Sequence, residues 1–307
     1  MKARLTFLTT IFAAALMLAF AAGTQAAKPK SVPSPVSDGF TLPETARQVS
    51  PNVYYLGAVE HNGRTAEGYA FVDNRGRNAK PVCGDNQCEP GENANKCPAD
   101  CGGGGPSPTP EPTPTPSDTS GCYGFLADGA KWKSVEPWVV NPSNPSGMSE
   151  SSVLSTLSSA IGDWENAASF NILGGGTTTT QTLVADTSSP DDQNEVYLGE
   201  IADSSTIGVT IVWGYFRGHP SWRELIEWDQ IYNESNYDWS EDCTAEDCTA
   251  KMDFPNIAIH ELGHSVGLDD LYDSTCSEMT MYGYGTEGET KKRDLEDGDI
   301  NGVSTLY

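Results

Sequence analysis

The chain has 307 residues, with 43 acidic against 18 basic side chains and a net charge of −25. This length suits one large domain with a smaller companion, and the charge disfavours nucleic acid and anionic lipid as partners. The excess of carboxylates is also typical of calcium sites or of adaptation to salt, and the composition does not separate these.

The first segment, residues 1–27, has the order of a secretory signal peptide. Lys2 and Arg4 precede an apolar run, and small residues around Ala26 end it. A membrane anchor is the alternative, but the run is near the shortest length that spans a bilayer, and no later segment is a transmembrane candidate. We therefore expect a secreted, extracellular protein whose eight cysteines form disulfides.

Residues 28–80 are expected to form a propeptide-like region. Within it, VYYLGAV and EGYAFVD flank His61-Asn62-Gly63-Arg64, the pattern of two strands joined by an Asn-Gly turn. An isolated hairpin is marginal in water. This one is therefore expected to pack against a later domain.

Residues 81–101 form a cysteine-rich module that is too short for a hydrophobic core. Its four cysteines are Cys83, Cys88, Cys97 and Cys101. Disulfides are the favoured interpretation and a zinc knuckle is the rival, while the nearby Asp85, Glu89 and Glu92 could hold calcium.

Residues 102–121, rich in Gly, Pro and Thr, lack apolar side chains to bury and form a linker. From Cys122 to the C-terminus, residues 122–307, the composition becomes that of a globular domain. We predict strands in TLVAD, VYLGEI, TIGVTIVW and ELIEWDQIYN.

Three helices are expected in this domain. Ser149 is a helix cap, and the apolar residues after it recur at helical spacing: Val153, Leu157, Ile161, Trp164 and Ala168. A second helix is predicted from about Pro255 to about Val266. A third closes the chain, with an apolar face of Ile300, Val303 and Leu306 or Tyr307.

The second helix carries HELGHSVGLDD, residues 260–270. His260 and His264 stand at i and i+4, so both imidazoles reach one metal ion. Glu261 lies one residue further round, where it can take the proton of a zinc-bound water without being a ligand. A helix end with acidic residues that cap a loop is the alternative without chemistry.

Gly267 strengthens the metal interpretation. Glycine tolerates the positive φ that ends a helix abruptly, so the chain can turn back and bring Asp270 to the same ion. Two histidines with one carboxylate form an accepted catalytic ligand set for zinc. Asp269 is the competing ligand, because a shift of one residue in the turn would present it instead.

HELGHSVGLDD resembles the extended metzincin motif HExxHxxGxx(H/D), in the Asp-ended form also seen in the snapalysin-like group. Metzincins place a methionine in a tight turn below the metal, and EMTMYGYG at 278–285 supplies Met281, with Met279 as the competitor. The terminal LEDGDINGVSTLY is similar to the closing helix of matrixins. What departs from the matrixin pattern is Asp270 in place of a third histidine.

The resemblance implies an α+β fold: a metzincin-like domain with a twisted, mostly parallel sheet, an active-site helix and a closing C-terminal helix, preceded by the small disulfide-rich module. It also implies an edge strand that pairs with extended substrate, for which TIGVTIVW is the candidate. Tyr282 or Tyr284 is a candidate hydrogen-bond donor to an oxyanion, although an aromatic residue there is more often core. We expect Cys122, Cys243, Cys248 and Cys276 to brace the loops around the helix as disulfides.

PVCGD, residues 81–85, is similar to the cysteine switch of matrixin propeptides, in which a thiolate binds the catalytic zinc. Here Val82 stands where that motif has arginine, and three other cysteines are available to pair with Cys83. Disulfide pairing is therefore favoured, and the motif leaves latency unexplained.

Together these features predict a secreted zinc endopeptidase, made as a precursor, that acts on protein or peptide substrates, with calcium as a second candidate ion. The alternative from another class is an exported surface or adhesion protein with a structural zinc. An open fourth position at the metal disfavours that alternative, because structural zinc sites normally have four protein ligands. A zinc amidase acting on cell-wall peptides differs only in substrate.

Overall fold

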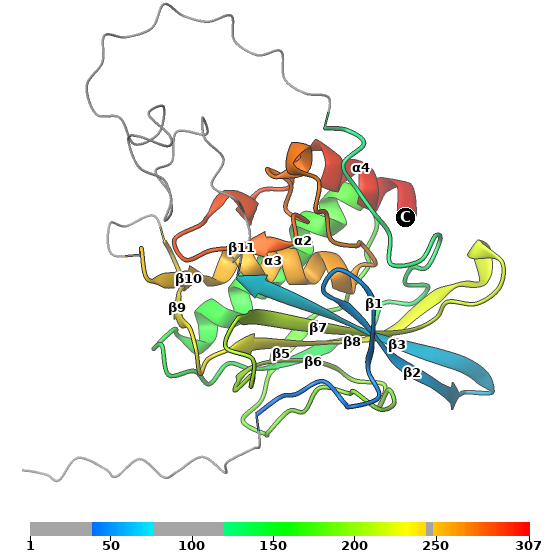
Figure 1. Ribbon diagram of the computed structural model, residues 1–307, viewed down its shortest axis with the longest axis horizontal. Coiled ribbons are helices and arrows are strands. Elements are labelled where there is room, and N and C mark those ends of the chain that lie inside the picture. Colours follow the sequence, from blue (N-terminus) through cyan, green and yellow to red (C-terminus); the bar gives the residue numbers. More distant parts are fainter. Residues whose placement is uncertain (1–38, 76–118, 244–247) are drawn as a thin grey trace, which may run out of the picture. The chain divides into compact units, whose positions relative to one another are not determined.

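The computed structural model describes residues 39–75, 119–243 and 248–307, which all belong to the unit Ser37–Tyr307. Helices lie against one mixed sheet (Figure 1). Three predicted features fall wholly or largely outside the described residues: the signal peptide at 1–27, the cysteine-rich module at 81–101 and the linker at 102–121.

Among the described residues, nine strands form this sheet. In spatial order they are β1 (Arg47–Ser50), β2 (Val53–His61), β3 (Arg64–Arg75), β7 (Thr206–Tyr215), β8 (Glu224–Asn233), β6 (Asn194–Gly199), β4 (Trp138–Asn141) and β5 (Gly176–Thr178), and β11 (Tyr284–Gly285) pairs with β3. A separate parallel pair joins β9 (Asp238–Ser240) to β10 (Lys251–Asp253).

The sheet is mixed, which corrects the prediction of a mostly parallel one. Strands β8, β6, β4 and β5 are parallel, but β7 runs antiparallel to β8, and β3, β2 and β1 continue antiparallel beyond it. Strand β7 makes the sheet mixed by itself, and the N-terminal strands β3, β2 and β1 add further antiparallel pairs beside it. An α+β fold is consistent with this arrangement.

The hairpin forms where the Asn-Gly pattern predicted it. Asn62 and Gly63 both have positive φ, 50° and 73°, as a tight turn between twisted strands requires. Strand β3 then pairs with β7 over a long register, from Glu67 opposite Gly214 to Asn74 opposite Thr206. The predicted edge strand, β7, therefore has a neighbour on both sides.

The segment TLVAD, residues 182–186, was predicted to be a strand and contains none. Its backbone N–H groups donate to side chains and not to a neighbouring strand: Val184 to Glu195, Ala185 to Tyr197 and Asp186 to Asp229. Backbone groups in a buried segment need partners, and these side chains supply them without a ladder.

Helix α2 (Glu150–Ala168) begins as predicted, because the Ser149 hydroxyl accepts from the backbone N–H of Ser152. Helix α4 (Asp297–Leu306) closes the chain, but one residue of its predicted apolar face is wrong. Ile300 is 38% exposed, whereas Val303 and Leu306 are buried. The neighbouring Gly298 and Gly302 pack closely against Cys122 and Tyr123, so the face that contacts the core is turned away from Ile300.

Helix α3 (Phe254–Ser265) carries the two histidines. The Asp253 side chain caps it by accepting from the backbone of Asn256, and Pro255 lies in its first turn. Gly267 has φ of 104°, and the N–H of Leu268 bonds back to the carbonyl of Gly263. The abrupt helix end that the glycine predicted is therefore confirmed.

Two apolar clusters hold these layers together. The larger one joins the sheet to α2 and α3, with Trp164, Ile257 and Phe71 fully buried in it. Alternate residues of a strand face opposite sides, so Ala70 and Val72, on either side of Phe71, belong to the second cluster. The side chains of β3 that share a face with Phe71 consequently point toward α3.

Two disulfides, Cys122–Cys276 and Cys243–Cys248, join the four cysteines that were expected to brace the loops near α3. No helix within the described ranges combines the length and apolarity needed to cross a membrane.

Candidate metal centre

Both histidines of α3 are buried and held in one tautomer. His260 Nδ1 lies 2.7 Å from the carbonyl oxygen of Thr280, and His264 Nδ1 lies 3.1 Å from that of Leu268. A carbonyl only accepts, so each Nδ1 carries the proton and donates it. Each Nε2 is therefore left with a lone pair, the form in which imidazole binds a metal.

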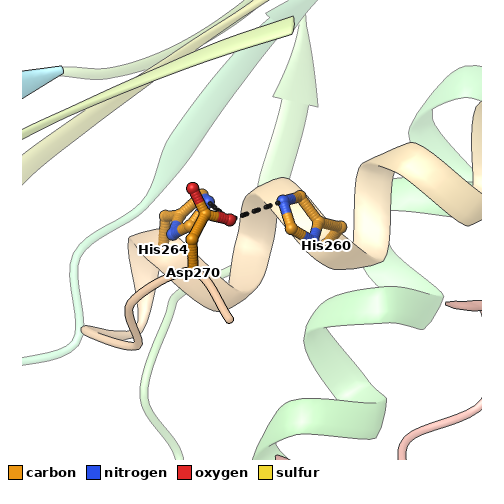
Figure 2. A group of neighbouring side chains, drawn as sticks. All are labelled: His260, His264 and Asp270. Carbon is orange, nitrogen blue, oxygen red and sulfur yellow. Dashed lines mark ion pairs between the residues drawn. The ribbon is translucent and has the colours of Figure 1, made fainter. Parts of the chain in front are cut away.

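Asp270 completes a group of three with the two histidines, as Figure 2 shows. The turn at Gly267 brings its Oδ1 to 3.4 Å from His260 Nε2 and 3.5 Å from His264 Nε2. Its Oδ2 accepts a hydrogen bond of 2.8 Å from the hydroxyl of Tyr272. Burial alone would raise the pKa of Asp270, but the neighbouring His264 and His260 outweigh it and hold the pKa well below its usual range.

These atoms fit a zinc ion. Bonds of about 2.0 to 2.2 Å in a tetrahedron separate two ligand atoms by about 3.4 Å, which is the spacing of Asp270 Oδ1 from each Nε2. All three of these atoms are buried and lack a hydrogen-bond partner among the described residues. Buried polar atoms are rarely left without a partner, so the donor set calls for a cation.

Glu261 is fully buried beside these ligands. Its Oε2 accepts from the hydroxyl of Thr210 on β7, while its Oε1 has no partner among the described residues. Gly208 makes room for it, since a Cβ there would lie 2.5 Å from Oε1. Burial and the charge of Asp73 raise the pKa of Glu261 to about 7, against the lowering effect of both histidines and of Thr210.

Met281 lies directly against α3. A Cβ on Gly263 would come within 2.1 Å of the Met281 sulfur, so the glycine lets this methionine pack under the helix segment between the histidines. Met279 packs instead with the Cys122–Cys276 disulfide. Of the two candidates for the methionine turn, Met281 has the position below the site.

The turn around Met281 is clamped by α4. The Asp299 carboxylate accepts from the backbone N–H groups of Thr280 at 2.8 Å and Met281 at 3.2 Å. Because the Thr280 carbonyl holds His260, Asp299 fixes the position of that histidine through the turn.

Asp269, the competing ligand, does not join the group. Its Oδ1 accepts from the backbone N–H of Asp270, which favours Asp270 as the residue presented to the metal. Neither Tyr282 nor Tyr284 makes a side-chain hydrogen bond to the site among the described contacts; their rings contact each other edge to face. The tyrosine that does reach the site is Tyr272.

Sequence reasoning missed four residues here: Asp73, Thr210, Tyr272 and Asp299. Tyr272, two positions after Asp270, is the one with a local signal. The others come from distant strands or from α4, and their approach depends on the sheet register and the packing of the terminal helix.

A second group of carboxylates lies away from the histidines. Asp186, Asp191 and Glu227 each offer an oxygen within 4.8 Å of one another. Glu227 is fully buried and its Oε1 has no partner among the described residues. Burial and the charge of Asp229 raise the pKa of Glu227 to about 10. Carboxylate oxygens are the ligands that calcium prefers, although calcium takes about six to eight oxygens and this group offers three carboxylate residues.

Part of the chain matches a known protein family. Residues 225–307 match the matrixin family. The chain is also 28% identical over 172 residues to "Metalloendoproteinase 2-MMP" of Arabidopsis thaliana, a match that covers 55% of this chain and 40% of that protein. Both similarities support a metzincin-type metallopeptidase. The matched range contains His260, Glu261, His264, Asp270 and Met281, and a zinc ion is the metal that this family implies for the group in Figure 2.

Proposed function

We propose that this protein is a secreted zinc endopeptidase in which His260, His264 and Asp270 hold the metal and Glu261 is the catalytic base. The observation that carries the proposal is the convergence of three buried ligand atoms beside a buried glutamate oxygen, all four without a hydrogen-bond partner in the part of the chain that the structure describes. The similarity to the matrixins supports it. Secretion rests on the predicted signal peptide and is compatible with the two disulfides.

Bound zinc would supply a Lewis acid that lowers the pKa of water and polarises a peptide carbonyl. Glu261 would take the proton of the attacking water on Oε1 and pass it to the departing amine nitrogen. The Thr210 hydroxyl holds Oε2, so the carboxylate keeps one orientation during this transfer. Tyr272 similarly holds the second oxygen of Asp270 and leaves Oδ1 for the metal.

The substrate would be an extended peptide that pairs with β7. That strand passes over α3, where Gly208 and Thr210 contact Glu261. Backbone pairing recognises extended chains with modest selectivity for side chains. We therefore propose broad endopeptidase activity on unfolded protein segments.

The test uses the full chain, as wild type and as Glu261→Gln, purified with its zinc content measured. Each protein is then treated briefly with trypsin to remove the N-terminal hairpin, the trypsin is inactivated with a serine-protease inhibitor, and the protein is incubated with denatured casein. We expect one zinc per chain in both, and hydrolysis by the wild type alone, which a chelator abolishes. Equal hydrolysis by both proteins would refute the role of Glu261, and absence of zinc would refute the metal site.

A structural zinc in an adhesion protein is the alternative from another class. It predicts that both proteins bind zinc and that neither cleaves any protein substrate after trypsin treatment. The buried Glu261 with a free oxygen beside the ligands favours the enzyme, because a structural site has no use for it. An amidase on cell-wall peptides would leave casein intact and hydrolyse isolated peptidoglycan fragments.

Calcium is proposed as a second, structural ion at Asp186, Asp191 and Glu227. The buried, unpartnered oxygen of Glu227 in a cluster of like charges supports a cation there.

A further inference from the structure

Strand β3 occupies the place that a substrate would take. It pairs antiparallel with β7 on one side; on the other side it pairs with β2 and, through Asn74 and Arg75 alone, with β11. An extended peptide that pairs with β7 beside the candidate metal centre would need the same hydrogen-bonding edge. The hairpin and a substrate therefore exclude each other.

Asp73 is the residue of β3 nearest the metal group. It shares a face with Phe71, whose ring stacks on His264 with centroids 4.1 Å apart, and its Oδ1 lies 3.9 Å from His260 Nε2. The side chain is 1% exposed, and neither carboxylate oxygen has a hydrogen-bond partner among the described residues.

A buried carboxylate without any partner is costly, by several kcal/mol, unless a cation compensates it. The His260 Nε2 atom cannot donate a hydrogen bond to Asp73, because the proton of that ring is on Nδ1. Lys292, the buried lysine nearby, donates to the carbonyl of Tyr282 instead. Asp73 also faces the carboxylate of Glu261, whose charge makes an uncompensated position still less favourable.

A cation held by the two histidines and Asp270 would also compensate Asp73, which stands outside that group of three but has its Oδ1 3.9 Å from His260 Nε2. We propose that residues 39–75 are an inhibitory segment of this enzyme and that Asp73 is the fourth protein ligand of its metal. This inference rests on the zinc site proposed above. It assigns to Asp73 the role that the sequence offered to Cys83, a residue outside the described part of the chain.

The hairpin is anchored around this contact. The Tyr272 hydroxyl that holds Asp270 lies 3.0 Å from the Pro51 carbonyl, and Arg75 forms an ion pair of 3.0 Å with Glu287. With Asp73 on the metal, the position that a water needs is filled and β7 is paired. Separation of residues 39–75 from the later domain would open both at once.

The experiment loads the full chain with cobalt(II), whose visible spectrum reports its ligands, and compares wild type with Asp73→Asn and Asp73→Ala. Glu67→Gln is the matched control, because Glu67 is a buried carboxyl of the same strand that bonds Arg217 and Tyr55, away from the histidines. The second readout is the rate at which the zinc-loaded proteins lose zinc to a chelator. The third is hydrolysis of a peptide before and after protease treatment.

We expect both Asp73 variants to change the cobalt spectrum and to release zinc roughly tenfold faster or more, whereas Glu67→Gln does neither. Peptide hydrolysis before protease treatment should be absent in all four proteins, because β3 still pairs with β7, and should appear once residues 39–75 are removed. An unchanged spectrum and release rate in both Asp73 variants would overturn the proposal. If these variants do not fold, the test uses the wild type alone. Its cobalt spectrum is recorded before and after proteolytic removal of residues 39–75, and the proposal requires that the spectrum change. Failure of the proposed function looks different: no protein binds metal, or the trimmed wild type binds zinc and hydrolyses nothing.

Discussion

Replacement of Gly208 by alanine should disable Glu261 without disturbing the fold. The new Cβ would stand 2.5 Å from Glu261 Oε1, about 0.9 Å closer than the 3.4 Å at which ordinary contact begins. Strand β7 stays paired with β8, where Gly208 lies opposite Tyr232, and therefore moves little, so the glutamate end must give way. Because Glu261 Oε2 is held by the hydrogen bond from Thr210, it is Oε1, the oxygen that would take the proton, that must be displaced.

A misplacement of about 1 Å costs on the order of 100-fold in rate, or about 2.7 kcal/mol of barrier. We expect kcat/KM of trypsin-treated Gly208→Ala to fall by about that factor. Zinc content should be unchanged, because no ligand is touched. The melting temperature should move by only a few degrees, because a flexible side-chain end is cheap to displace.

The assay is hydrolysis of a fluorogenic peptide, with zinc stoichiometry and thermal unfolding measured on the same preparations. Gly162→Ala is the control: it makes the same replacement at a position where no atom lies within 4 Å of the added Cβ. A Gly208→Ala enzyme with at least half of wild-type kcat/KM would refute the placement of Glu261, as would loss of zinc from that variant.

Three further predictions concern stability. Asp299→Ala should lower the free energy of unfolding by about 3 kcal/mol in denaturant titration, because it leaves the N–H groups of Thr280 and Met281 buried without a partner; a loss below 1 kcal/mol would contradict the clamp. Replacement of Cys122 and Cys276 by serine should cost up to about 5 kcal/mol, since the bond closes a loop with a sequence separation of 154, and denaturant midpoints with and without the bond measure this. In chelator, the melting temperature should fall as pH rises from about 4.5 toward 10, because Glu227 keeps its proton when folded, with a pKa of about 10, and loses it when unfolded. Added calcium should raise the melting temperature most at the alkaline end, and a chelator curve that rises with pH would exclude this explanation.

The metal group itself could be predicted from a short stretch of sequence. An i, i+4 spacing puts His260 and His264 on one side of any helix, and only a residue that accepts positive φ lets the chain return within three positions, as Gly267 does at 104°. The structure brings together the same three residues, and it favours Met281 over Met279 by its contact with Gly263. The hairpin could also be predicted from the sequence, because its turn depends on the conformations of Asn62 and Gly63 alone.

What only the tertiary structure decided lies far apart along the chain. The approach of Asp73 to His260 depends on which strand β3 joins and in which register, and a shift of one residue would turn Asp73 to the other face. The pairing of β3 with β7 also extended the sheet by antiparallel strands and removed the edge expected at TIGVTIVW. Ile300 is exposed because α4 packs through the face that carries its glycines, Gly298 and Gly302. Local spacing thus determined the candidate ligands, whereas long-range strand pairing determined what covers them.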